Sequence, residues 1–186
     1  MSGRNVPSPE STAIDRVLRP AVFFDRDGVL NVDSEHLFEI DRHVWIGCAI
    51  EAIKAVNDAD YFAFVITNQS GVATGVTRRL ISMVHDWMVG QLATHGARID
   101  ASEYCPFHPD GRVEHYRRAS ERRKPQPGMI IDLFEKFPVD AITSFVVGDK
   151  PSDIEAARAA GLAGHVLSCR QSAGFYLAAP GERVAS

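Results

Sequence analysis

Short, unbroken apolar runs alternate along this chain with segments whose apolar residues recur at helical spacing. Unbroken apolar runs bounded by turn residues are typical of strands that are buried on both faces of a parallel sheet. Such runs predict strands at residues 21–25, 61–67, 142–147 and 164–167, and the less apolar segment 99–105 is interpreted as a weaker third strand. The helical spacing predicts helices at 48–57, 127–137, 154–160 and directly after Thr77. This alternation predicts an α/β fold with a doubly wound, mostly parallel sheet and helices on both of its faces.

The segment after Thr77 has the clearest helical pattern. Thr77 is a suitable N-cap residue, because its hydroxyl can accept a hydrogen bond from a free amide of the first turn. The apolar residues that follow form one stripe, made of Ile81, Val84, Met88 and Leu92. His85 and Trp87 lie on or beside this stripe, and we interpret them as packing residues.

Length and composition narrow the class of protein. The chain has 186 residues, of which 45% are apolar and 24% charged, as expected of one soluble domain. Its net charge of −4 argues against nucleic-acid binding, and no run approaches the ~18 apolar residues of a membrane span. The three widely spaced cysteines indicate no disulfide framework. We therefore expect a cytoplasmic monomer with a flexible leader at 1–19, one folded domain at 20–178 and a tail at 179–186.

Carboxylates and a hydroxyl follow three of the predicted strands. Asp25 and Asp27 come after the first strand, Thr67 ends the second, and Asp149 and Asp153 follow the fourth. In a doubly wound sheet such strand ends converge on one crevice, where ligands bind. Carboxylates crowded into a crevice repel one another unless a cation neutralises them. Mg²⁺ suits oxygen ligands of this kind.

We predict that Mg²⁺ is held by the side chains of Asp25 and Asp149 and the backbone carbonyl of Asp27. Asp153 is left with two interpretations of equal weight, as a helix N-cap or as support for the metal site. A carboxylate can also act as a nucleophile toward phosphorus, which divides one difficult displacement into two easier steps. This chemistry makes Asp25 the candidate nucleophile and Asp27 the candidate acid/base.

The transferring phosphoryl group needs positive charge and hydrogen-bond donors around its oxygens. Thr67 offers a hydroxyl, and the loop after it offers backbone amides. Lys124 offers a cation at the end of the run Arg122-Arg123-Lys124-Pro125, although charge pattern alone would favour an exposed basic loop. The position of this run, between a strand and a Pro-Gly helix start, favours a functional lysine.

Four motifs together resemble the haloacid-dehalogenase superfamily of phosphatases. They are DRDGVLN (25–31), TNQSGVATG (67–75), RRKPQPGM (122–129) and VGDKPSDIEAA (147–157), in that order. Within the superfamily they are most similar to the D,D-heptose 1,7-bisphosphate 7-phosphatases and the related histidinol-phosphate phosphatases. The resemblance implies a compact, essentially capless Rossmann-like domain that removes the 7-phosphate of a heptose bisphosphate.

The resemblance also assigns roles to residues of this chain. It implies that Asp25 is phosphorylated, that Asp27 protonates the leaving oxygen and then activates water, and that Thr67 and Lys124 stabilise the phosphoryl group. It implies that Asp149 completes the magnesium site. The positions at which the heptose enzymes contact substrate correspond here to Asp33, Ser34, Glu35, His36, Asn68, Gln69, Ser70, Arg123 and Lys150.

Two features depart from this family pattern. Relatives often bind a structural zinc ion through four cysteine and histidine residues, and the corresponding positions here are Cys105, Phe107, Ser120 and Arg122. Because one thiolate makes a poor tetrahedral set, we predict no structural zinc and expect packing of Phe107 and Tyr116 to hold the loop. In the substrate segments, Glu35-His36 replaces the expected Gly-Tyr and Thr74 stands where arginine is common.

These departures leave other functions open. A histidinol-phosphate phosphatase or another small sugar-phosphate phosphatase is the main alternative. A polynucleotide-end phosphatase is disfavoured by the acidic net charge. A phosphoacceptor switch domain also clusters Asp, Thr and Lys, but Asp27 argues against it, because an acid/base near the phosphoryl group promotes turnover. A non-catalytic binding module is disfavoured because competent residues occupy all four chemical positions.

Overall fold

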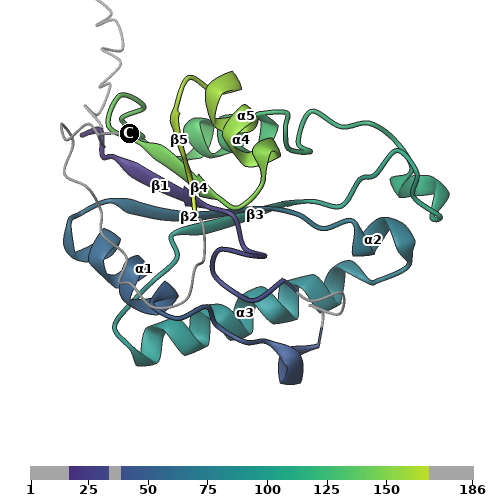
Figure 1. Ribbon diagram of the computed structural model, residues 1–186, viewed down its shortest axis with the longest axis horizontal. Coiled ribbons are helices and arrows are strands. Elements are labelled where there is room, and N and C mark those ends of the chain that lie inside the picture. The colour runs from purple at the N-terminus through teal and green to yellow at the C-terminus, as the bar shows by residue number, and fades with distance from the viewer. Residues whose placement is uncertain (1–16, 34–38, 168–186) are drawn as a thin grey trace, which may run out of the picture.

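A single parallel sheet forms the centre of the molecule (Figure 1). The computed structural model describes residues 17–33 and 39–167. Its five strands have the order β3-β2-β1-β4-β5, and every neighbouring pair is parallel. The strands are β1 (Ala21–Phe24), β2 (Phe62–Asn68), β3 (Ala101–Cys105), β4 (Phe145–Gly148) and β5 (Ala163–Val166). The predicted α/β fold with a doubly wound parallel sheet is confirmed.

Helices cover both faces of this sheet, and Figure 1 shows them as layers on either side of it. One face carries α1 (Ala49–Asp58) and α3 (Arg78–Thr94), and the other carries α4 (Gly128–Lys136) and α5 (Pro151–Ala159). Three short elements lie in the connections, namely the 3-10 turns η1 (Ile40–Arg42) and η2 (Glu114–Tyr116) and the short helix α2 (Gly71–Thr74).

The central strand β1 divides its side chains between the two layers. Val22 and Phe24 pack with α1 and α3, whereas Ala21 and Phe23 pack with α4 and α5. All four side chains are at most 1% exposed, as expected for a strand buried on both faces. Burial of a phenylalanine of this kind contributes about 1.5–3 kcal/mol. This packing fixes the strand end from which the candidate catalytic residues extend.

The predicted stripe and cap of α3 are confirmed. Ile81, Val84, Met88 and Leu92 are all buried, and the Thr77 hydroxyl accepts a hydrogen bond from the amide of Leu80. The apolar stripe faces the sheet together with α1. Trp87 packs against His43 and Trp45, which agrees with its interpretation as a packing residue.

The largest shifts from the predicted starts are found in one strand and one helix. The strand predicted from 142 begins at Phe145, because Ile142 lies in a turn and is 94% exposed. The carboxylate of Asp140 closes this turn by accepting hydrogen bonds from the amide of Ile142 and the hydroxyl of Thr143. The helix predicted from 154 begins at Pro151, since the Asp153 carboxylate accepts from the amide of Lys150 and caps the first turn.

The predicted leader, the predicted tail and the segment 34–38 fall largely or wholly outside the described residues. Their assignments therefore stay predictions. Within the described parts, none of the helices is long and apolar enough to cross a bilayer.

Candidate active site

A pocket opens where β1, β2 and β4 end, at the carboxyl edge of the sheet. Asp25 and Asp27 follow β1, Thr67 and Asn68 end β2, and the first turn of α5 follows β4. The residues that line the pocket are Asp25, Asp27, Thr67, Asn68, Lys124, Lys150, Ser152 and Asp153. The fold therefore brings together all four predicted catalytic residues.

Lys124 is a buried cation between two carboxylates. It is 4% exposed, and its Nζ lies 2.8 Å from Asp25 Oδ1 and 2.7 Å from Asp153 Oδ1. Its Nζ also donates to the carbonyl of Ile66, at 2.9 Å. The amide side chain of Asn68 holds the backbone of Lys124 from both sides, donating to its carbonyl and accepting from its N–H, each at 3.0 Å. Lys124 is thus fixed in place rather than part of an exposed basic loop.

Asp25 is a buried carboxylate at the end of the central strand. Burial raises the pKa of Asp25 to about 6, and the neighbouring Lys124 opposes that rise. Its Oδ1 accepts from the amide of Arg26 at 2.7 Å, and its own amide donates to the carbonyl of Val147 on β4. A pKa of about 6 leaves the carboxylate ionised at neutral pH, as a nucleophile must be.

Asp27 is held by four hydrogen-bond donors. Its Oδ1 accepts from Arg26 Nε at 2.7 Å and from Asn31 Nδ2 at 3.2 Å. Its Oδ2 accepts from Arg26 Nη2 at 3.1 Å and from Gln69 Nε2 at 2.8 Å. Burial alone would raise the pKa of Asp27. The charge of Arg26 and the hydrogen bonds from Arg26, Asn31 and Gln69 instead keep this pKa below its ordinary value.

A cluster of carboxylates fits a divalent cation. Among the described residues, Asp25, Asp149 and Asp153 each place one carboxylate oxygen within 4.8 Å of the others. Oδ1 of Asp149 is buried and accepts no hydrogen bond from any described residue, which a bound cation would remedy. Burial, reinforced by Asp153, raises the pKa of Asp149. Three clustered carboxylates against one buried lysine, with the exposed Lys150 paired to Asp33, leave the negative excess and hard oxygen donors that suit Mg²⁺.

Gly28 makes room for this cluster. Its φ is +89°, and a Cβ at this position would lie 2.2 Å from Asp149 Oδ2. Any other residue would displace that carboxylate, which explains why glycine closes the turn after Asp27.

Asp153 combines the two interpretations left open by the sequence. One of its oxygens caps α5, and the other pairs with Lys124 inside the carboxylate cluster. The side chain is fully buried at 0% exposure. Asp153 therefore joins the lysine to the candidate metal site and fixes the start of α5 at the same time.

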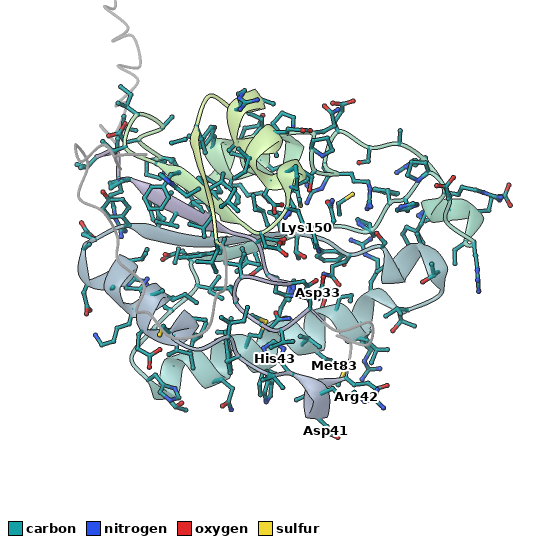
Figure 2. All side chains as sticks on the ribbon, in the orientation of Figure 1. Asp33, Asp41, Arg42, His43, Met83 and Lys150 are labelled. Atoms are coloured by element: carbon teal, nitrogen blue, oxygen red, sulfur yellow. The ribbon has the colours of Figure 1, made fainter. Side chains whose placement is uncertain are left out.

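The predicted substrate-contact residues fall into four groups. Lys150 and Asp33 form an exposed ion pair of 2.9 Å at the rim (Figure 2). Arg123 donates to the Ser70 hydroxyl at 3.0 Å, and burial lowers the pKa of its guanidinium. The side chain of Asn68 turns inward to Lys124, and that of Gln69 turns inward to Asp27 and Thr67. Ser34, Glu35 and His36 lie outside the described residues.

Packing and ion pairs hold the loop that contains the positions where relatives often bind zinc. The rings of Phe107 and Tyr116 lie 5.9 Å apart, and the Arg118 guanidinium sits 4.0 Å above Phe107. Arg122 forms ion pairs with Glu103 and Asp132. Phenylalanine and arginine are not zinc ligands, so the described donor set does not fit a tetrahedral site, and the absence of zinc stays a prediction.

Sequence reasoning missed three functional candidates. Arg26 and Asn31 hold Asp27, and Ser152 lines the pocket. Arg26 could have been noticed, since an arginine between two carboxylates at the end of an apolar strand needs a buried partner. The contacts of Asn31 and Ser152 depend on how the loops close, which a linear pattern does not reveal.

Comparison with known proteins gives relatives over most of the chain. A family model described as HAD-hydrolase-like matches residues 121–168. A D-glycero-beta-D-manno-heptose-1,7-bisphosphate 7-phosphatase of Rhodopseudomonas palustris is 48% identical over 147 residues, which cover 78% of this chain and 82% of the relative. A D-glycero-alpha-D-manno-heptose-1,7-bisphosphate 7-phosphatase of Burkholderia mallei is 40% identical over 154 residues, or 82% of each chain.

A solved structure agrees with these matches. The crystal structure of D,D-heptose 1,7-bisphosphate phosphatase from B. bronchiseptica, complexed with magnesium and phosphate, is 34% identical to this chain. It superposes with a TM-score of 0.71 over 79% of each chain. Similarity in sequence and in fold thus point to the same group of proteins.

Proposed function

The chain belongs to the D-glycero-D-manno-heptose-1,7-bisphosphate 7-phosphatase family of HAD-like hydrolases, and from this membership we propose that it removes the 7-phosphate of that bisphosphate. The observation that carries the proposal is the pocket itself, in which Asp25, Asp27, Thr67 and Lys124 meet beside a carboxylate cluster. This set supplies a nucleophile, an acid/base and phosphate-binding groups for hydrolysis of a phosphomonoester.

In the first step, an oxygen of the Asp25 carboxylate attacks phosphorus. A new bond forms between that oxygen and phosphorus, and the bond between phosphorus and the C7 oxygen breaks. Asp27 gives a proton to the C7 oxygen, which leaves as the sugar hydroxyl. A phosphate dianion next to Asp27 raises the pKa of this carboxyl, because a like charge disfavours its ionised form, and thereby favours the protonated acid.

In the second step, water attacks phosphorus of the aspartyl phosphate. Asp27, now ionised, accepts a proton from that water, and the bond between phosphorus and the Asp25 oxygen breaks. The four donors around Asp27 favour this ionised form, which is the base required here. Inorganic phosphate leaves, and both carboxyl groups return to their starting states.

Lys124 and Thr67 act on the charge of the transferring group. Lys124 is held so rigidly that it can offset this charge without rearranging. Thr67 is 1% exposed, and its oxygen accepts from Gln69, so its hydroxyl hydrogen remains available for a phosphate oxygen. Asp25 and Asp149, with the carbonyl of Asp27, would hold Mg²⁺, and Asp153 would support them. Bound Mg²⁺ supplies positive charge to the phosphate oxygens.

Steady-state turnover on a substrate panel tests the proposed function. The panel consists of both anomers of D-glycero-D-manno-heptose 1,7-bisphosphate, histidinol phosphate and a hexose 6-phosphate, each with Mg²⁺. We expect the highest kcat/KM with one heptose bisphosphate anomer and release of the 7-phosphate alone. A higher value with histidinol phosphate would favour the alternative function, and no turnover of any ester would contradict a phosphatase.

Binding of Mg²⁺ should stabilise the folded protein, because the ion neutralises a buried excess of negative charge. At a concentration ~100-fold above its Kd, we expect the ion to raise Tm by roughly 5–10 °C. The variant Asp149→Asn should lose most of this increase, whereas the matched variant Asp86→Asn, on the exposed side of α3, should keep it. Differential scanning calorimetry with and without Mg²⁺ measures the effect, and an increase retained in Asp149→Asn would refute the assigned metal site.

A further inference from the structure

Arg26 is a completely buried arginine between the two candidate catalytic aspartates. It is 0% exposed and is the largest of the fully buried side chains among the described residues. Its Nε and Nη2 bind the two oxygens of Asp27, at 2.7 and 3.1 Å. This fork supplies two of the four donors to Asp27 and all of the positive charge among them. The position of the Asp27 carboxylate therefore depends on the plane of the Arg26 guanidinium.

The third nitrogen of this guanidinium reaches α3. Arg26 Nη1 lies 3.3 Å from Nε2 of His85, a residue 59 positions away in the sequence. Arginine has only donors, so Nε2 of His85 must accept, and the ring must be neutral with its proton on Nδ1. Burial, and then the charge of Arg26, lower the pKa of His85 to about 4, which agrees with a neutral acceptor. The edge of the ring also contacts Tyr104, at a centroid distance of 6.0 Å.

We propose that His85 is a positioning residue, which fixes the plane of the Arg26 guanidinium and through it the Asp27 carboxylate for proton transfer. Asn31 and Gln69 each touch one oxygen of Asp27, and neither contacts the third guanidinium nitrogen. His85 is the described side chain that binds that nitrogen, and it is anchored on the 17-residue helix α3. Helix α3 therefore reaches the acid/base through two side chains.

This inference rests on the proposed function, and it makes the effect of His85 specific to proton transfer. Departure of an alkoxide such as the C7 oxygen needs the proton of Asp27, whereas departure of p-nitrophenolate does not. The value of kcat/KM reports only the steps from free enzyme and free substrate up to cleavage of the ester bond. Hydrolysis of the aspartyl phosphate comes later and does not affect it. A displaced Asp27 therefore lowers kcat/KM for the sugar phosphate and leaves kcat/KM for p-nitrophenyl phosphate near that of the unmodified protein.

The test compares His85→Leu, His85→Gln and the unmodified protein on heptose 1,7-bisphosphate and on p-nitrophenyl phosphate. Leucine fills the space but cannot accept a hydrogen bond from Arg26. We therefore expect kcat/KM for the heptose ester to fall ~10-fold or more, with little change for the aryl ester. Glutamine carries an acceptor on a side chain of similar reach, so His85→Gln should recover most of the loss. The matched control is His95→Leu, at the exposed end of the same helix, which should change neither value.

The outcomes separate the two proposals. An equal loss on both esters, or a loss that His85→Gln does not recover, would give His85 a purely structural role and overturn the inference. Unchanged kinetics in His85→Leu would overturn it as well. Absence of turnover in the unmodified protein would instead refute the proposed function.

Discussion

Replacement of Asp25 with asparagine should reduce turnover of heptose 1,7-bisphosphate by roughly 10⁴-fold or more, because it removes the nucleophile. The asparagine side chain has the same shape but is a poor nucleophile toward phosphorus. The carboxylate is 5% exposed at the end of the central strand, where the amide of Arg26 and the ammonium of Lys124 hold it in position. The loss should appear in kcat, as measured by phosphate release under saturating substrate and Mg²⁺.

A folded protein is the essential control for Asp25→Asn. Burial raises the pKa of Asp25 to about 6, so its ionised form is destabilising in the metal-free protein at neutral pH. Asparagine carries no charge, and we expect a Tm in the absence of Mg²⁺ that is equal to or above that of the unmodified protein. Normal turnover by a folded Asp25→Asn variant would contradict the assignment of Asp25.

Replacement of Lys124 with methionine should impair both activity and stability. Methionine preserves the length of the side chain but leaves Asp25 and Asp153 buried without their shared cation, which costs about 3–5 kcal/mol of unfolding free energy. Loss of a preorganised charge at the phosphoryl group should lower kcat by roughly 10²–10³-fold. Urea denaturation and steady-state kinetics measure the two effects.

The stability loss in Lys124→Met should depend on pH in a definite direction. The pKa of Asp25 is already raised, and removal of Lys124 raises it further. An acid with a raised pKa in the folded state costs stability as the pH rises through that pKa, so the loss should be larger at about pH 8 than at about pH 5. The exposed Lys54, which forms an ion pair with Asp58 on α1, provides the control variant Lys54→Met, for which we expect little change at either pH. A loss independent of pH would argue against the buried ion pairs as its cause.

Sequence patterns were sufficient for the layers of the fold and for the core of the site. Apolar runs such as 61–67 located the strands because a parallel strand is buried on both faces, and the polar residues after them had to meet at one edge. Asp25, Asp27 and Thr67 were placed correctly relative to one another for this reason. The position of Lys124 before a Pro-Gly helix start favoured a functional lysine, and the resemblance of four motifs agreed with it, although the charge pattern alone did not indicate its burial.

Contacts between distant segments were beyond the reach of these patterns. Periodicity placed His85 on α3, but its contact with Arg26 arises from the packing of that helix against the sheet. Apolar residues at 142 suggested an earlier start for β4, whereas hydrogen bonds to Asp140 hold Ile142 in an exposed turn. Local hydrogen bonds of this kind override hydrophobic pattern, and only the folded chain reveals them.

The central claim is that Asp25 carries the phosphoryl group during turnover. Rapid acid quench of the protein mixed with heptose 1,7-bisphosphate and Mg²⁺, followed by mass spectrometry of its peptides, tests this claim most directly. We predict one phosphoryl group on the peptide that contains Asp25, formed within the first turnover and absent from the Asp25→Asn variant. Product formation at the normal rate with no phosphorylated peptide, or with the phosphoryl group on another residue, would contradict the mechanism.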